Sequence, residues 1–192
     1  EIFTPENAFI YGEIIGRRYQ NKPVIWILGG DRNIETDEHK AIIKAMASGI
    51  KKEDKGNHLM TYHPMGGSNS ARFFHDEKWL NFNMFQSGHN EQNIPNYEFN
   101  LSNLRLLPLK PTIDGEPRYE DHPIDWKPEN GWFDDYDVRQ AAYWSVFSGA
   151  MGHTYGNHNI WQMWHPGHEP ISSARTPWKE AMDYPGAYQM AF

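Results

Sequence analysis

The chain has 192 residues, enough for one domain with a sizeable hydrophobic core. Its formal net charge is −7 and no basic run stands out, which argues against nucleic acid as the main partner. The absence of cysteine excludes both a disulfide scaffold and a thiolate metal site. Mean hydropathy is −0.79, and no apolar run reaches the roughly 18 residues that cross a membrane, so we expect no membrane-spanning segment.

Aromatic residues are abundant: they make up 15% of the chain, with 8 Trp, 10 Tyr and 10 Phe. Trp and Tyr combine a flat apolar face with a polar edge, which suits sugar rings and other flat, hydroxylated ligands. Most of these side chains are nevertheless expected to fill the core.

The first predicted helix begins at Thr4, Pro5 and Glu6, which supply an N-cap, a first-turn proline and an acid at the positive end of the helix dipole. Residues 24–28 are an unbroken apolar run and predict a strand buried on both faces. Gly29 and Gly30 then permit a tight turn into Asp31.

Four further strands are predicted, and helices separate them. The predicted strands cover residues 58–63, 80–86, 110–113 and 150–155. Helices are expected over 36–49, from Asn96, around 138–149 and from Thr176. A charged connection is expected at 51–55 and a long loop at 121–135. The long loop exceeds a simple connector, so it is a candidate binding loop. The alternation is typical of βα units around a parallel sheet, hence an α/β fold.

Polar side chains follow each predicted strand, where α/β folds place their chemistry. Two carboxylates, Asp31 and Glu116, come directly after strands. A pair of carboxylates is the usual equipment for glycoside hydrolysis. Asp114 and Glu120 compete with Glu116 for that role, and the sequence does not show which carboxyl group has the raised pKa.

The histidines raise the alternative of a metal-dependent hydrolase. Nine of them were considered as imidazole ligands, with Asp31 or Glu116 as carboxylate ligands: His58, His63, His75, His89, His122, His153, His158, His165 and His168. No His-Glu-x-x-His or His-x-His pattern occurs, and neither does a nucleotide-binding glycine motif. We therefore expect no metal and no cofactor.

Five segments occur in an order that resembles glycoside hydrolase family 140, a group of bacterial apiosidase-like enzymes with a (β/α)₈ barrel. The segments are Trp26-Ile27-Leu28-Gly29-Gly30-Asp31-Arg32-Asn33, Tyr62-His63-Pro64, Gln86-Ser87-Gly88-His89, Asp114-Gly115-Glu116-Pro117-Arg118-Tyr119-Glu120 and Gly149-Ala150-Met151-Gly152-His153-Thr154-Tyr155-Gly156. The resemblance implies a retaining mechanism, with Asp31 as acid/base after strand four and Glu116 as nucleophile after strand seven.

The resemblance also implies a (β/α)₈ TIM barrel of which residues 1–192 hold only strands 4–8, because a full barrel needs about 250 residues. The first residues, Glu1 to Thr4, look like the middle of a protein. We expect the N-terminal half of the barrel to come from the same or another chain. Export in a bacterium is expected from the family alone.

The expected partner is an oligosaccharide or polysaccharide of plant type. The side chains expected to bind it, beside the two carboxylates, are Arg32, Asn33, His63, Gln86, His89, Tyr119, His153, Tyr155 and Trp161. Trp161 is expected to stack on the sugar, although a loop folded over its own aromatic residues explains it equally well. The alternative function is a carbohydrate-binding fragment without turnover.

Overall fold

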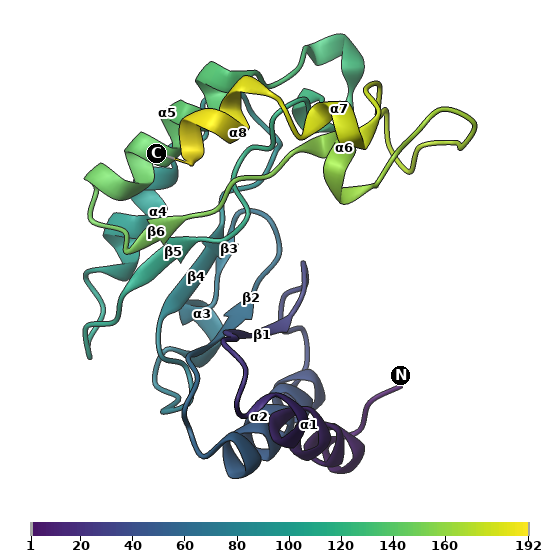
Figure 1. The fold of residues 1–192 in the computed structure, drawn as a ribbon. Helices are drawn as coiled ribbons and strands as arrows, with labels where there is room; N and C mark the ends of the chain where they lie inside the picture. Colours follow the sequence, from purple (N-terminus) through teal and green to yellow (C-terminus); the bar gives the residue numbers. More distant parts are fainter. Residues whose placement is uncertain (1, 192) are drawn as a thin grey trace.

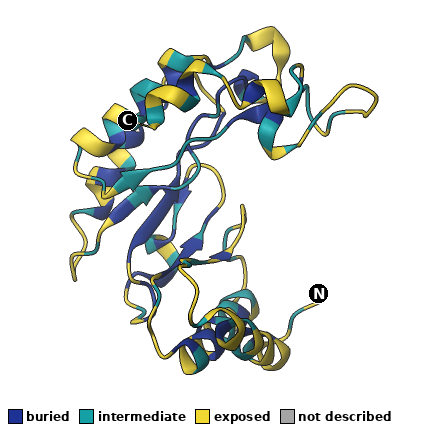
Figure 2. Cartoon of the chain, in the orientation of Figure 1, coloured by how far each residue is buried: buried dark blue, intermediate teal, exposed yellow. Residues whose placement is uncertain are grey.

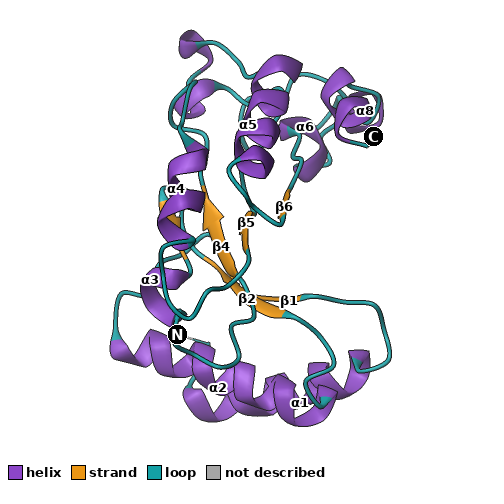
Figure 3. Ribbon diagram, turned by 90° about the vertical axis from the view of Figure 1, so that its left-hand side faces the viewer, coloured by secondary structure: helices purple, strands orange, loops and turns teal. Residues whose placement is uncertain are grey.

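The computed structural model describes residues 2–191 as an arc of short strands with helices along its outer side (Figure 1). A helical pair lies at one end of the arc and several helices lie at the other. Figure 3 shows the same arrangement from the side, with the strands between the two groups of helices. The buried residues concentrate along the central strands and the loops that leave them (Figure 2).

The strands form two groups. Their bounds are β1 Trp26–Gly29, β2 Met60–His63, β3 Ser68–Asn69, β4 Asn83–Gln86, β5 Thr112–Asp114 and β6 Gly152–His153. β1 and β2 pair in parallel, and β4, β5 and β6 form a parallel ladder with β3 antiparallel at its edge. β2 also approaches β4, because Thr61 Oγ1 donates a 2.8 Å hydrogen bond to the carbonyl of Phe82.

The parallel strands therefore follow one another in chain order, as βα units require. All five predicted strands are confirmed over shorter spans, and β1 and β5 each end one residue later than predicted. Over residues 2–191 the strands make an open arc and not a closed barrel. The structure thus shows a mixed α/β fold.

The helices are α1 Pro5–Tyr19, α2 Asp37–Asp54, α3 Ala71–Phe74, α4 Asn96–Asn103, α5 Asp135–Phe147, α6 His158–Trp161, α7 Trp178–Ala181 and α8 Pro185–Met190, with 3₁₀ turns η1 Ile124–Trp126 and η2 Pro128–Asn130. Thr4 caps α1 and Thr36 caps α2, as predicted. The expected charged connection at 51–55 is wrong, because α2 continues to Asp54 and ends in a left-handed Lys55.

α1 and α2 pack through glycines. Gly12 and Gly16 of α1 are buried against α2, and Gly49, expected near the end of its helix, is buried inside α2. A Cβ atom on Gly49 would lie 2.1 Å from the carbonyl oxygen of Phe9, so only glycine permits this approach. Apolar side chains of α1 are less completely covered than these glycines, and Tyr11 stays 45% exposed.

The prediction that the first strand is buried on both faces is wrong. Leu28 is buried, and it joins a core cluster that includes Met60, Tyr62 and Phe74. Ile25 and Ile27 are 55% and 52% exposed. The physical reason is that β1 is hydrogen-bonded only to β2 and lies at an edge of the described sheet.

No helix within residues 2–191 has the length and apolar character needed to cross a lipid bilayer.

Candidate active site

The turn after β1 places Asp31 at the carboxyl end of the strands. Gly29, Gly30 and Asp31 all have positive φ, at 78°, 146° and 48°. The two glycines adopt this backbone conformation freely. Asp31 carries a side chain, for which the left-handed region is unfavourable, and such residues cluster at functional sites. The turn folds back so that the backbone N–H of Asp31 meets His63 at the end of β2.

Glu116, two residues beyond β5, lies between two imidazoles. Its Oε2 is 3.0 Å from Nε2 of His63, and its Oε1 is 3.2 Å from Nε2 of His89. The Glu116 side chain is 18% exposed and that of His89 is 5% exposed. Each carboxylate oxygen therefore accepts a hydrogen bond in a largely desolvated setting.

These contacts fix the charge of Glu116. Burial opposes its ionisation, but the hydrogen bonds from His63 and His89 outweigh burial and lower its pKa to about 2. The pKa of His63 moves the other way: burial lowers it, but the hydrogen bond to Glu116 and the contact with the Pro64 carbonyl outweigh burial and raise it. Glu116 is thus an ionised carboxylate across the physiological pH range.

His63 connects the two carboxylate residues. Its Nδ1 lies 3.1 Å from the backbone nitrogen of Asp31 and 2.8 Å from the carbonyl oxygen of Pro64. A neutral ring accepts from the N–H of Asp31, and a protonated ring donates to Pro64. In both forms Nε2–H donates to Glu116, so one ring positions Glu116 and contacts the turn that carries Asp31.

Asp31 and Glu116 line the same cavity, of about 170 Å³, together with Gln86, His89 and Trp126. Asp31 is exposed at this cavity, whereas Glu116 is largely buried. The remaining lining residues are Met65, Gly66, Gly88 and Asn90. The structure therefore places two carboxylates in different environments around one small space.

Asp114, at the end of β5, lies behind Glu116 in a separate network. Its carboxylate accepts hydrogen bonds from Ser87 Oγ at 2.7 Å and from Asn96 Nδ2 at 3.1 Å. Burial raises its pKa to about 6, against the lowering effect of these bonds. Because the Gly88 N–H also donates to the Glu116 carbonyl at 3.0 Å, Asp114 and Glu116 together hold the segment that ends in His89.

A family model described as "Apiosidase-like, catalytic domain" matches residues 1–192. The chain belongs to the apiosidase-like catalytic domain family. The resemblance to apiosidase-like enzymes that the five sequence segments predict is thereby confirmed. Among curated proteins, no significant match to this apiosidase-like chain was found.

Solved structures agree with this assignment. One described as a glycoside hydrolase is 40% identical, with a TM-score of 0.91 over 98% of this chain and 45% of its own. One described as a glycoside hydrolase family 5 protein from Bacteroides vulgatus is 38% identical, with a TM-score of 0.91 over 98% of this chain and 44% of its own. A putative glycoside hydrolase from the same organism is 20% identical, with a TM-score of 0.58 over 92% and 33%, and shows likeness of fold alone. The apiosidase-like chain thus spans less than half the length of the first two structures.

Five sequence-predicted residues of the apiosidase-like domain gather at Glu116 or its cavity. Asp31, His63, Gln86 and His89 contact Glu116 or line the cavity with it. Tyr119 packs against His89 with ring centroids 4.6 Å apart. Burial raises the pKa of the Tyr119 hydroxyl, so this ring is a neutral neighbour of the site.

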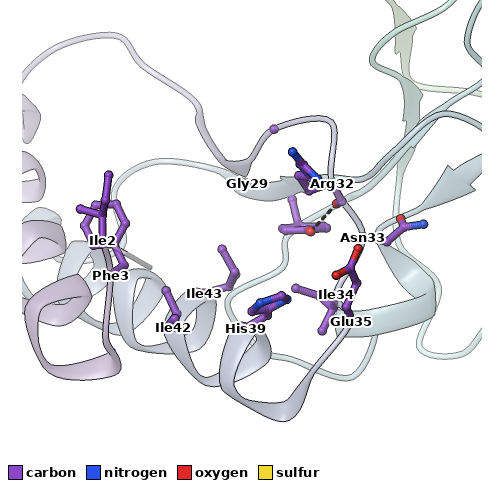
Figure 4. Close-up of a pocket in the computed structure, with 12 residues that line it drawn as sticks. Ile2, Phe3, Gly29, Arg32, Asn33, Ile34, Glu35, His39, Ile42 and Ile43 are labelled. Atoms are coloured by element: carbon purple, nitrogen blue, oxygen red, sulfur yellow. Dashed lines mark hydrogen bonds between the residues drawn. The ribbon is translucent and has the colours of Figure 1, made fainter.

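Arg32 and Asn33 line a different cavity, of about 520 Å³, between the turn after β1 and α2 (Figure 4). Its walls include Ile34, Ile42 and Ile43 from the segment before α2 and from α2 itself. The carbonyl of Arg32 accepts a 2.5 Å hydrogen bond from the Tyr62 hydroxyl. This contact is a second anchor of the turn, in addition to His63.

His153 and Tyr155 also lie at another cavity, of about 380 Å³, lined by α5 and the end of α8. His153 Nδ1 is 3.0 Å from Ser145 Oγ, and burial lowers its pKa to about 4. The Tyr155 hydroxyl donates a 2.6 Å hydrogen bond to Glu120, whose other oxygen accepts from the Gly186 N–H. Glu120 is therefore engaged away from the Glu116 cavity.

Trp161, expected to stack on a sugar, lies in α6 and donates a 3.3 Å hydrogen bond from Nε1 to His158. The tryptophan at the Glu116 cavity is Trp126, which is not among the binding residues predicted from the sequence. Its signal was the long loop at 121–135, in which Trp126 lies. Within residues 2–191, no group of three or more His, Asp or Glu side chains is placed to hold a metal ion.

Proposed function

We propose that the chain carries the catalytic centre of a retaining glycosidase, with Glu116 as nucleophile and Asp31 as general acid/base. The observation that carries the proposal is the pair of imidazoles on Glu116, which keeps this carboxylate ionised beside a second, exposed carboxylate at the same cavity. Membership of the apiosidase-like family and two glycoside hydrolase relatives support the same class of reaction.

The different environments suit the two roles. A nucleophile must be ionised, and the hydrogen bonds from His63 and His89 ensure this for Glu116. An acid/base group must exchange protons with the leaving group and with water, and Asp31 is the exposed member of the pair.

The reaction then has two steps. Glu116 forms a bond to the anomeric carbon while the glycosidic bond breaks and Asp31 gives its proton to the departing oxygen. In the second step Asp31 takes a proton from water, the water oxygen bonds to the anomeric carbon, and the ester bond to Glu116 breaks. As the ester forms, Glu116 loses its negative charge, and the hydrogen bonds that it accepts from His63 and His89 become weaker.

We propose an oligosaccharide or polysaccharide of plant type as substrate, in line with the apiosidase-like family. We also propose that the arc corresponds to strands four to eight of a (β/α)₈ barrel. The support is the unpaired side of β1, where Ile25 and Ile27 are exposed and two apolar cavities adjoin the strand. A preceding barrel strand, from the same or another chain, would cover this edge.

The stereochemical outcome tests the mechanism. The chain, in its natural polypeptide, is incubated with a panel of aryl glycosides, and the anomeric configuration of the first product is followed by NMR. Retention of configuration is expected, together with a covalent adduct on Glu116 when a 2-deoxy-2-fluoro glycoside with a good leaving group is used. Inversion would contradict the assignment of Glu116 as nucleophile, and binding of sugars without turnover would contradict the glycosidase itself.

A further inference from the structure

Trp126 is partly exposed to solvent and lies at the cavity of Glu116. It lines the cavity that holds Asp31 and Glu116, and it remains 48% exposed. It ends the 3₁₀ turn η1, in the loop between the end of β5 and α5. A large aromatic ring that is half exposed at a carboxylate cavity presents an apolar surface for which the described chain offers no cover.

The backbone that presents Trp126 is unusual. Asp125 has φ 56° and ψ 31°, and Trp126 has φ 62°, so two consecutive non-glycine residues are left-handed. Such a conformation is unfavourable for residues with a side chain and persists only where surrounding contacts hold it. Here the contacts are the Asp125 N–H to the His89 carbonyl at 2.8 Å and the Trp126 N–H to the Pro123 carbonyl at 3.0 Å.

The first of these bonds ties the loop to the histidine that donates to Glu116. Trp126 is therefore positioned relative to the proposed nucleophile through a short path, from its neighbour Asp125 to His89 and on to Glu116. A displacement of the loop would therefore move His89, and a displacement of His89 would move the loop.

The indole is supported from behind by rings. Its centroid lies 4.4 Å from that of His122 at 79°, and 6.1 Å from that of His89 at 83°. His122 is fully buried and burial lowers its pKa to about 3, so the supporting ring is uncharged. The indole thus packs against a buried, uncharged ring and lines the cavity with part of its remaining surface.

We infer that Trp126 is the platform on which the sugar ring attacked by Glu116 rests, with the C–H face of that ring against the exposed indole. The inference rests on the proposed function, which it deepens. It predicts preference for sugars that have an apolar face, with hydroxyl groups directed toward Gln86 and Asn90 on the cavity wall. Trp126 is then a specificity-determining residue.

The test compares two tryptophans, one at the cavity and one away from it. Trp126→Ala and Trp126→Phe are measured against Trp178→Ala, because Trp178 is partly exposed and lies in α7, outside the cavity of Glu116. With an aryl glycoside that the natural polypeptide cleaves, Trp126→Ala is expected to lower kcat/KM about 10-fold or more, chiefly through KM. Trp126→Phe should recover most of this loss, and Trp178→Ala should stay within about 3-fold of the unsubstituted protein.

A second measurement separates this inference from the proposed function. Monosaccharides are titrated while tryptophan fluorescence is followed, in the unsubstituted protein and in the three variants. Saturable quenching that Trp126→Ala abolishes and Trp178→Ala retains supports the platform even if no glycoside is cleaved. Cleavage with equal kcat/KM in Trp126→Ala and Trp178→Ala, or no sugar binding by the unsubstituted protein, would overturn it. Thermal unfolding of each variant shows that the comparison concerns folded proteins.

Discussion

Asp114 and Glu116 are two residues apart at the end of β5, and their carboxyl pKa values are shifted in opposite directions. Asp114 is fully buried, and its pKa is raised to about 6, although Ser87 and Asn96 donate to it. Glu116 is also largely buried, yet its pKa is lowered to about 2. Burial acts in the same direction on both groups, so burial does not explain the difference.

The difference lies in the donors. A hydroxyl and an amide stabilise the anion of Asp114 without carrying charge, whereas the imidazoles on Glu116 are able to carry a positive charge. Asp114 is therefore bound to the segment after β4 and to the start of α4, whereas Glu116 is held as an anion. The following experiments examine this division, from the largest expected effect to the smallest.

Loss of the anion itself should have the largest effect. Glu116→Gln is expected to lower kcat/KM on an aryl glycoside by about 10³-fold or more, because no nucleophile remains. Asp114→Asn should lower it by only about 10-fold, through the positioning of Ser87 and His89. Glu120→Gln is the matched control, since Glu120 is bound by Tyr155 and Gly186 away from the cavity. A greater loss in Asp114→Asn than in Glu116→Gln would reverse the division proposed here.

Removal of one imidazole donor to Glu116 should have the second-largest effect on kcat/KM. His89→Phe keeps a ring against Tyr119 and His122 but removes the hydrogen bond to Glu116. We expect the pKa of Glu116 to rise, the acid limb of the pH profile of kcat/KM to move to higher pH, and kcat/KM to fall about 10-fold to 100-fold. His165→Phe, in the loop after α6, is the control. An acid limb that stays in place in His89→Phe would show that His89 does not set the charge of Glu116.

The two carboxylates should also give opposite pH dependences of stability. The folded pKa of Glu116 lies below its ordinary 4.5, so its stabilising effect is present above pH 4.5 and is lost as the pH falls toward about 2. The folded pKa of Asp114 lies above its ordinary 3.8, so its effect is present below pH 3.8 and is lost as the pH rises through about 6.

Urea unfolding from pH 3 to pH 7 measures both effects, as the difference between the unsubstituted protein and each variant. The difference in free energy of unfolding between the unsubstituted protein and Glu116→Gln should become smaller toward pH 3. The corresponding difference for Asp114→Asn should become smaller toward pH 7. Above pH 6.5 the raised pKa of His63 adds a decline to the Glu116 curve, because the unfolded chain then releases the His63 proton that the folded protein still holds. Parallel curves for the two variants would refute the opposite shifts.

The smallest effect concerns one neutral donor. Ser87→Ala removes the 2.7 Å hydrogen bond to Asp114, so the pKa of Asp114 should rise further above its ordinary value. The free energy of unfolding should fall by about 1 kcal/mol, the usual effect of one hydrogen bond. A side-chain NMR titration of Asp114 follows the pKa, and Ser48→Ala on the exposed surface of α2 serves as the control. A lowered pKa of Asp114 would contradict the role assigned to Ser87.

Much of this arrangement could be read from the sequence. Apolar runs followed by glycine, proline or histidine located the five strands, since burial and turn chemistry are local signals. Because parallel strands end at one edge, the residues after them meet, and Asp31, His63, Gln86, His89 and Glu116 do so. The chemical roles of these residues remain predictions.

Other features depend on contacts that no local pattern records. Trp126 lines the cavity from a loop in which two consecutive residues adopt left-handed backbone, whereas Trp161 has equally suitable chemistry and donates to His158. The exposure of Ile27 follows from the absence of a partner on one side of β1 within residues 2–191. An apolar run predicts that a strand is suited to burial, but the neighbouring elements decide whether it is buried.

The glycines between α1 and α2 have a consequence for the order of folding. Gly12, Gly16 and Gly49 each weaken their helix by about 1 kcal/mol relative to alanine, so neither helix is strongly favoured by itself. The same glycines allow the close backbone contact that stabilises the pair. Helix formation and docking should therefore occur together, and substitutions at these glycines should slow the folding reaction instead of only hastening the unfolding reaction.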